Sequence, residues 1–158
     1  MKMPTKEQMT LNKDEFWSFS NAKWQREELA NALIAAQELY RVDCNLVLLF
    51  LYAAQQGLII DNCDALYECS SAHQRSRLRP LRQARKGFAE TSLYNQAKEL
   101  ELAAEKFAQD DYCRIALFEK GRADKFTFVE QLSDYLAYLS ILAPASTAVE
   151  LASEIWDR

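Results

Sequence analysis

Glycine and proline are scarce in this chain of 158 residues, which contains three of each. Average usage of the two residues together is about 12%, so few residues are left for the tight turns of β-hairpins. β-Branched residues are also few, with four Val, six Ile and five Thr against 21 Leu and 22 Ala. This balance favours helix over strand and argues against a β-sandwich, a barrel, a Rossmann sheet and a disordered chain.

The sequence contains one histidine, His73. It therefore lacks the second imidazole of an H-E-x-x-H zinc helix or of a paired E-x-x-H di-iron bundle site. Its glycines form neither a G-x-G-x-x-G nor a G-x-x-x-x-G-K-[ST] loop. The cysteines form no C-x-x-C pair and lack the spacing of structural zinc ligands. We therefore predict no metal and no cofactor, and we identify no catalytic residue.

Export and membrane signals are missing as well. Residues 1–9 are polar, without the apolar core of a signal peptide. The longest apolar run, residues 44–54, has eleven residues, whereas a bilayer needs about 20. We expect a cytoplasmic protein without membrane contact, whose cysteines stay free thiols in a reducing compartment. These are Cys44, Cys63, Cys69 and Cys113.

Helix start and stop signals divide the chain into about seven segments. Asp43 is placed to cap the apolar run, and Gly57 is placed to end it. Capping-box patterns predict three other helix starts, at Asn12-x-x-Glu15, Thr127-x-x-Glu130 and Thr147-x-x-Glu150. We predict an all-α fold, a single compact helical-bundle domain of about seven helices over residues 1–158, with residues 1–10 flexible.

Two segments show apolar residues at helical spacing. A helix opening at Thr91 or Ser92 carries a coiled-coil-like seam, with an interruption expected at Asp110-Asp111 before it continues towards Gly121. The seam residues are Leu93, Ala97, Leu100, Ala104 and Phe107. In residues 126–143 the apolar face is wider than one stripe. We expect that helix to be deeply buried or to cover a partner, including a second copy of the chain.

Five short motifs follow one another along the chain. They are Phe16-Trp17-x-Phe19-Ser20, Leu33-x-x-x-Gln37, Cys44-Asn45-Leu46-x-Leu48-Leu49, Pro80-Leu81-Arg82-x-x-Arg85 and Glu99-Leu100-x-x-x-x-Glu105. In this order and spacing they resemble a small proteobacterial family of conserved hypothetical proteins, a domain of unknown function, over about residues 14–113.

Two positions depart from the pattern of that family. Cys44 stands where Val is expected before the Asn, and Ala72-His73 replaces an aromatic residue ahead of Pro-Leu-Arg. The family has no established activity. The resemblance therefore implies a cytoplasmic helical domain and no catalytic residues.

Aromatic residues gather near the first helix start, at Phe16, Trp17, Phe19 and Trp24. Aromatic residues at helical spacing after a capped start are more often core residues than the lining of a ligand groove. Asn45 interrupts an otherwise apolar helix. A buried amide without a hydrogen bond costs about 1–3 kcal/mol, so we expect Asn45 to bond a neighbouring group rather than a ligand.

Arg85 falls between Leu78 and Leu81 on a helical wheel, so its stem is expected to face the core. The following helix offers three counter-ions for a partly buried structural ion pair: Glu99, Glu101 and Glu105. A catalytic Arg–carboxylate pair is the alternative, because perturbed charges also gather at active sites. A triad of His73 with a carboxylate and a Cys or Ser is possible in any helical protein of this size and carries no weight.

A basic segment lies within this acidic chain, whose net charge is −4. Residues 69–89 hold five Arg and one Lys and no acidic residue. Four of them step by four, three and four residues, which places them on one helix face: Arg75, Arg79, Arg82 and Lys86. Pro80 is expected to kink or split this helix. The planar fork of Arg suits phosphate and carboxylate groups, so this stripe is the candidate anion-binding surface.

Two functions stay open. One is a non-enzymatic binding or regulatory module whose arginine face contacts nucleic acid or an acidic protein surface. The alternative is a small helical enzyme that uses carboxylate and Arg groups in a bundle pocket. A convex basic ridge would favour the first and a deep pocket with convergent carboxylates the second. Acidic residues of the same domain could also neutralise the stripe.

Overall fold

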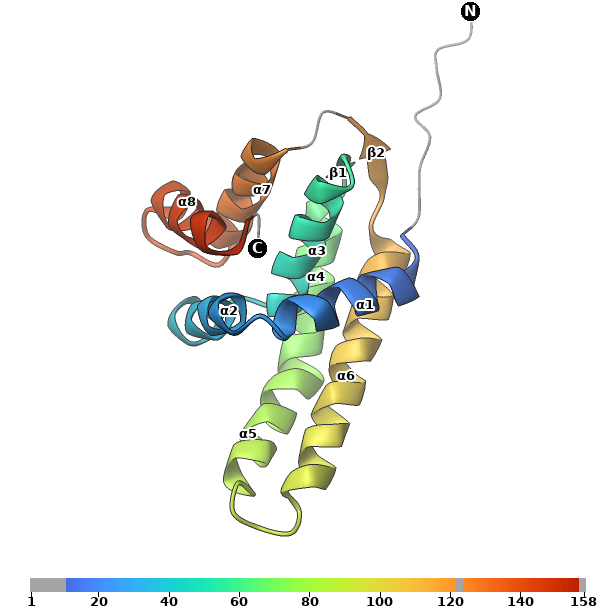
Figure 1. The fold of residues 1–158 in the computed structure, drawn as a ribbon, viewed down its shortest axis with the longest axis vertical. Coiled ribbons are helices and arrows are strands. Elements are labelled where there is room, and N and C mark those ends of the chain that lie inside the picture. The colour runs from blue at the N-terminus through green and yellow to red at the C-terminus, as the bar shows by residue number, and fades with distance from the viewer. Residues whose placement is uncertain (1–10, 122–123, 157–158) are drawn as a thin grey trace, which may run out of the picture.

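The computed structural model describes residues 11–121 and 124–156. Its helices are α1 Lys13–Trp24, α2 Glu27–Tyr40, α3 Cys44–Gln55, α4 Cys63–His73, the π-helix η1 Gln74–Leu78, α5 Arg79–Gly87, α6 Tyr94–Ile115, α7 Lys125–Tyr138 and α8 Pro144–Ile155. Because α4, η1 and α5 follow one another without a break, they form one long helix beside α6 (Figure 1). The predicted all-α fold of about seven helices is confirmed. The flexibility predicted for residues 1–10 lies outside the described residues.

Helix α3 lies at the centre of the core. Every residue from Cys44 to Ala54 is buried, because α1, α2, α6, α7 and the strand β1 all contact this helix. The predicted signals at both ends are confirmed. The carboxylate of Asp43 accepts from the backbone N–H groups of Asn45 and Leu46 at 3.0 and 3.4 Å, and Gly57 follows the last turn with a φ of +72°.

The sequence pattern did not predict the two short strands. β1 Leu58–Ile60 and β2 Phe118–Lys120 pair antiparallel, with Ile59 opposite Glu119. We expected residues 118–120 to continue the preceding helix. Three residues of strand give too short a pattern to distinguish from a helix by periodicity.

Pro80 does not split the long helix that contains it. In the π-turn just before it, the backbone N–H of Arg79 bonds the carbonyl of Gln74, five residues back. Proline lacks an N–H, and its ring pushes against the carbonyl four residues earlier. A wider turn at this point accommodates that ring, so the helix continues to Gly87.

Helix α6 corrects the predicted seam. It runs through Asp110-Asp111 without interruption, and the seam residues Leu93, Leu100 and Phe107 are exposed. The buried face includes two of the predicted residues, Ala97 and Ala104, and also Ala108, the carboxylate of Glu101 and the amide of Gln109. A pattern that counts apolar residues alone could not identify this face.

The last two helices begin earlier than their capping boxes predicted. Asp124 caps α7 and accepts from the backbone N–H of Thr127 at 3.2 Å. Helix α8 starts at Pro144, a residue favoured in the first turn. α7 and α8 pack side by side (Figure 1). Much of the wide apolar face of α7 is therefore buried inside the chain, and self-association through residues 126–143 stays a prediction.

All four cysteines are free, with Cys44 and Cys113 buried and Cys63 and Cys69 half-buried. Between residues 11 and 121 and between 124 and 156, the structure shows no helix with both the length and the apolar character that a membrane crossing requires.

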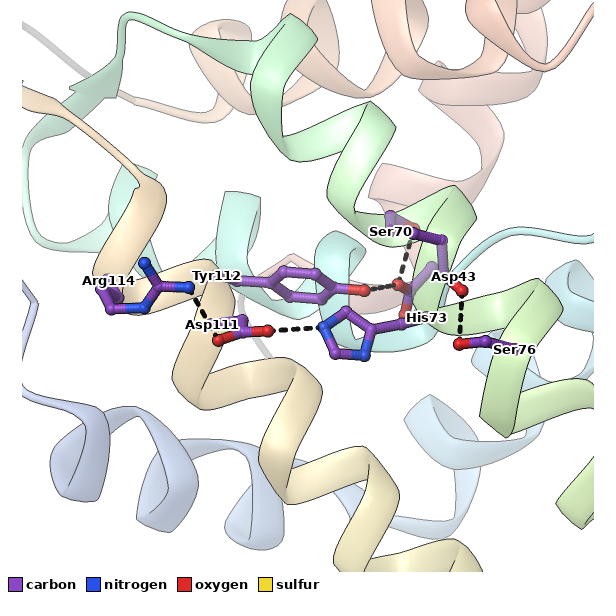
Figure 2. A network of polar contacts seen from close by, with 8 residues as sticks. Asp43, Ser70, His73, Ser76, Asp111, Tyr112 and Arg114 are labelled. Atoms are coloured by element: carbon purple, nitrogen blue, oxygen red, sulfur yellow. Dashed lines mark hydrogen bonds and ion pairs between the residues drawn. The ribbon is translucent and has the colours of Figure 1, made fainter.

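Asp43 is the polar centre of the core and is 1% exposed. Its Oδ2 accepts from the hydroxyl of Ser70 on α4, at 2.7 Å, and from that of Tyr112 on α6. Its backbone N–H donates to the hydroxyl of Tyr135 on α7, at 2.8 Å. Figure 2 shows Ser70 and Tyr112 meeting at the same carboxylate. Burial and the charge of Asp43 raise the pKa of both tyrosines above its ordinary value, so both hydroxyls stay protonated.

We predict that Asp43→Ala lowers the free energy of unfolding by about 3–5 kcal/mol, because it removes a helix cap and strands the Ser70 and Tyr112 hydroxyls. Urea unfolding followed by circular dichroism measures the change. Asn12→Ala is the matched control, because Asn12 caps α1 at an exposed position. That variant should lose about 1 kcal/mol. Equal losses in the two variants would contradict a special role for Asp43.

Candidate ligand-binding cleft

A pocket of about 300 Å³ lies between the end of α2 and the face of η1 and α5. Four cations line it, one from the end of α2 and three from α5: Arg41, Arg79, Arg82 and Lys86. The amides of Gln37, Gln74 and Gln83 complete the polar lining. None of the described residues that line it is acidic. We call this cavity the cationic pocket.

Arg41 reaches the cationic pocket from a left-handed backbone conformation, with a φ of 58°. This conformation is uncommon for residues other than glycine, and it reverses the chain between α2 and α3. Sequence analysis missed Arg41. It lies far from the basic segment, and no local pattern links the two.

The predicted stripe is only partly assembled. Arg79, Arg82 and Lys86 line the cationic pocket, whereas Arg75 lies outside it, with its Nε 3.4 Å from the carbonyl of Ser71. Three members of the stripe therefore meet Arg41 in a hollow, and these residues do not form the convex ridge that would have favoured a binding module.

Two of the four cations also face acidic side chains. The Nε of Arg82 lies 3.7 Å from Glu101, and the Nζ of exposed Lys86 lies 3.8 Å from exposed Glu38. Arg41 and Arg79 form no ion pair with the described part of the chain. Because the Lys86 pair is exposed to solvent, it contributes little. The acidic side chains of the domain therefore neutralise only part of the positive charge of these four cations.

A larger cavity of about 600 Å³ adjoins the cationic pocket. The two cavities share the side chains of Gln37, Gln74 and Arg82. The larger cavity lies between α1 and α2 on one side and α5 and α6 on the other, and its lining includes the first residues of α3. The large apolar and aromatic side chains of its lining are Trp24, Ile34, Tyr94 and Leu102.

Glu101 is the carboxylate that Arg85 contacts. Glu101 is 7% exposed and accepts a hydrogen bond from the Nε of Arg85. This hydrogen bond raises the pKa of Arg85 above its ordinary value. Glu99, another candidate counter-ion, is exposed and has no ion pair with a described residue. Arg85 and Arg82 therefore balance a single buried carboxylate.

Glu105, the third candidate, lines the larger cavity without an ion pair or a hydrogen bond to any described residue. Burial, followed by the charge of Glu101, raises the pKa of Glu105 from an ordinary 4.5 to about 7. Near neutral pH, part of the population therefore carries a proton and can donate a hydrogen bond.

Asn45 lies in the lining of the larger cavity, at the start of α3. Its Oδ1 accepts from the Nε2 of Gln109 at 2.8 Å, and the same nitrogen donates to Ser20 at 3.0 Å. Asn45 therefore forms a hydrogen bond to a neighbouring side chain, as we expected from the sequence. The Nδ2 of Asn45 has no hydrogen-bond partner among the described residues, although Asn45 is 6% exposed.

The aromatic cluster does not form a groove. Phe16 is buried, and its ring centroid lies 5.7 Å from that of Tyr52. Phe19 packs on the same tyrosine at 4.9 Å. The ring of Trp17 faces the ammonium of Lys106 instead. Of the four aromatic residues, Trp24 lines the larger cavity.

Cys69, His73 and Asp111 form a separate cluster, with their polar atoms within 4.8 Å of one another. The Nε2 of His73 and a guanidinium nitrogen of Arg114 lie 2.8 and 3.0 Å from the carboxylate of Asp111 (Figure 2). Burial opposes ionisation of Asp111, but these two hydrogen bonds outweigh it and lower its pKa.

This cluster does not have the geometry of a catalytic triad. The thiol of Cys69 lies near the Asp111 carboxylate rather than across the imidazole from it, as a triad requires. Burial also raises the pKa of that thiol, whereas reactive cysteines have a lowered pKa. Within the described ranges, the cluster offers three possible ligands, and structural zinc sites use four. We interpret it as a hydrogen-bonded cluster that joins α4 to α6.

A family model described as "protein of unknown function (DUF2390)" matches residues 15–111. The chain belongs to this family. Every described residue that lines the two cavities lies within the DUF2390 match, whereas α7 and α8 lie outside it. No curated protein and no solved structure matches the chain.

Polar residues of the motifs that carried the resemblance meet in this DUF2390 domain. They come from four segments that are distant in the sequence, and all of them line the larger cavity: Gln37, Asn45, Arg82, Arg85 and Glu105. Ser20, from a further motif, is linked to Asn45 because the amide nitrogen of Gln109 donates a hydrogen bond to each of them. The fold therefore gathers the motifs at one place, which makes the adjoining cavities the candidate functional site.

We predict that Arg85→Ala lowers the free energy of unfolding by about 2–3 kcal/mol, because buried Glu101 then keeps Arg82 alone as its counter-ion. Lys86→Ala is the matched control, because its exposed pair with Glu38 should contribute less than about 0.5 kcal/mol. Urea midpoints measure both changes. An unchanged midpoint for Arg85→Ala would show that the pair does not stabilise the fold.

We predict that Glu105→Gln stabilises the protein more at high pH than at low pH. The folded protein holds the Glu105 proton up to a pKa of about 7, and the ordinary value is 4.5. Stability from this group is therefore present below pH 4.5 and is lost as the pH rises through 7. The gain from the amide should be larger at pH 8 than at pH 4 by about 2 kcal/mol, allowing for partial exposure.

The matched control for this pH dependence is Glu99→Gln, an exposed position on the same helix. Its effect on the denaturation midpoint should be the same at both pH values. A Glu105→Gln effect that is equally independent of pH would contradict the raised pKa.

Proposed function

We propose that this protein is a non-enzymatic binding module that recognises an anionic partner through the cationic pocket. The observation that carries the proposal is the convergence of four cations from two separate segments on one hollow, with no acidic residue in its described lining. Such a hollow concentrates positive potential in a chain whose net charge is −4. Free thiols in the core agree with a cytoplasmic site of action.

Arginine supports anion recognition better than lysine would at the same positions. Three of the four cations are Arg, whose planar fork donates two parallel hydrogen bonds to a phosphate or carboxylate group. The amides of Gln37 and Gln83 add neutral donors at the rim. A hollow of this size favours a protruding anionic group on the partner over a flat acidic surface.

Charge reversal tests the proposal. Arg41→Glu/Arg79→Glu changes two exposed cations that make no ion pair with a described residue, so the fold should be retained. Arg75→Glu/Arg77→Glu makes the same change in charge outside the pocket. Inorganic phosphate, a short RNA and an acidic peptide are titrated against each protein at low and at high salt.

We expect the parent and the control to bind at least one probe, and the pocket variant to bind that probe more weakly by about tenfold or more. High salt should weaken binding in every case. Two results would overturn the proposal: the parent binds none of the probes at low salt, or the pocket variant binds as tightly as the control.

One observation favours the alternative of a small helical enzyme. Glu105 has a pKa of about 7 and lies in a cavity that Arg82 and Arg85 also line. A group that titrates near the working pH is suited to general acid–base catalysis. A reaction that is lost in Glu105→Gln while ligand affinity is retained would support the enzyme over the binding module.

A further inference from the structure

The cationic pocket and the larger cavity adjoin each other and share part of their walls. Gln37, Gln74 and Arg82 belong to the walls of both. Volumes of about 300 and 600 Å³ fall within the usual range for small-molecule pockets. A ligand held by its anionic end in the first cavity would therefore extend into the second.

The cationic end suits a terminal phosphate. Arg41, Arg79 and Lys86 surround a space where Arg82 is also available, and a phosphomonoester carries nearly two negative charges at neutral pH. The hollow lies between α2 and α5. A terminal phosphate needs an opening on one side of such a hollow, whereas a phosphodiester continues as a chain on both sides.

The larger cavity and its boundary with the cationic pocket offer polar groups without partners among the described residues. Gln74 is 7% exposed, and its side chain forms no hydrogen bond with the described residues. The Nδ2 of Asn45 is free in the same way. Neither amide has a fully buried atom without a partner, so the unpaired atoms of both reach the cavity space. Two such amides in the lining of one cavity are therefore free to bond a group that supplies donors and acceptors.

The remaining walls of the larger cavity match a planar group. Trp24 and Tyr94 provide aromatic surface, and every nucleobase has a face that stacks on such side chains. Glu105, with a pKa of about 7, can accept or donate a hydrogen bond. Amide and carboxyl groups read the edges of bases by paired hydrogen bonds.

We propose that the site binds a nucleoside monophosphate, with its phosphate in the cationic pocket and its base in the larger cavity beside Asn45, Gln74 and Glu105. This inference rests on the proposed function and names the ligand class of the same pocket. In this assignment Gln74 and Asn45 select the base, and Arg79 and the other cations of the cationic pocket bind the phosphate.

Calorimetric titration of the full chain with AMP, GMP, CMP and UMP tests the assignment. The corresponding nucleosides and inorganic phosphate are titrated alongside. We expect at least one nucleotide to bind about tenfold more tightly than either its nucleoside or phosphate alone. Arg79→Glu should weaken the binding of both that nucleotide and phosphate.

Tyr94→Leu separates the two ends of the site, because half-buried Tyr94 lines the larger cavity alone. It should weaken nucleotide binding about tenfold and leave phosphate binding unchanged. Gln96→Leu is the matched control, because Gln96 is exposed on α6 outside both cavities, and it should change neither affinity. If Tyr94→Leu does not fold, Trp24→Leu replaces it, since half-buried Trp24 also lines the larger cavity alone.

The outcomes distinguish this inference from the proposed function. If phosphate, RNA or an acidic peptide binds at least as tightly as every nucleotide, the ligand class is overturned and the anion-binding module stands. If none of these compounds binds, both fail. Equal weakening of nucleotide and phosphate binding in the larger-cavity variant would overturn the placement of the base.

Discussion

The buried carboxylate of Asp43 is the contact on which the arrangement of these helices depends. Removing a carboxylate from water is costly unless its oxygens are hydrogen-bonded. Asp43 meets this condition with two backbone N–H groups of its own helix and the hydroxyls of Ser70 and Tyr112. These hydrogen bonds form together in one relative position of α3, α4 and α6. The carboxylate therefore fixes how three helices meet, beyond what apolar packing alone specifies.

The same contact places the candidate site. Because Asp43 fixes the start of α3, Asn45 is held in the lining of the larger cavity, and the preceding left-handed residue, Arg41, is turned towards α5. Tyr112 anchors α6 at the other side, two turns beyond the position from which Glu105 lines the cavity. The core and the site are therefore not independent, and changes at Asp43 would alter both.

Local rules predicted the helical fold, the cap at Asp43, the end at Gly57 and the core position of Phe16. Each of these depends on residues near one another in the sequence. The pattern failed where distant residues decide the outcome. The buried face of α6 includes Glu101 and Gln109 because Arg85 and Asn45 provide their partners. Arg41 joins the cations of α5 because α2 packs on α1, α3 and α8 in a position that brings its end to the cationic pocket, and no spacing rule contains this.

Charge is distributed unevenly between the cationic pocket and the larger cavity, because some of their charged side chains have a partner of opposite charge and others do not. The lining of the larger cavity holds three basic side chains, Arg82, Arg85 and Lys98, against three acidic ones, Asp43, Glu101 and Glu105. Glu105 avoids a second buried negative charge by taking up a proton near neutral pH. Arg41 and Arg79 keep an unbalanced positive charge at the opposite end. A ligand with one anionic end and one neutral polar end would therefore bind in one orientation, because reversing it would place the anion beside Glu101 and Glu105.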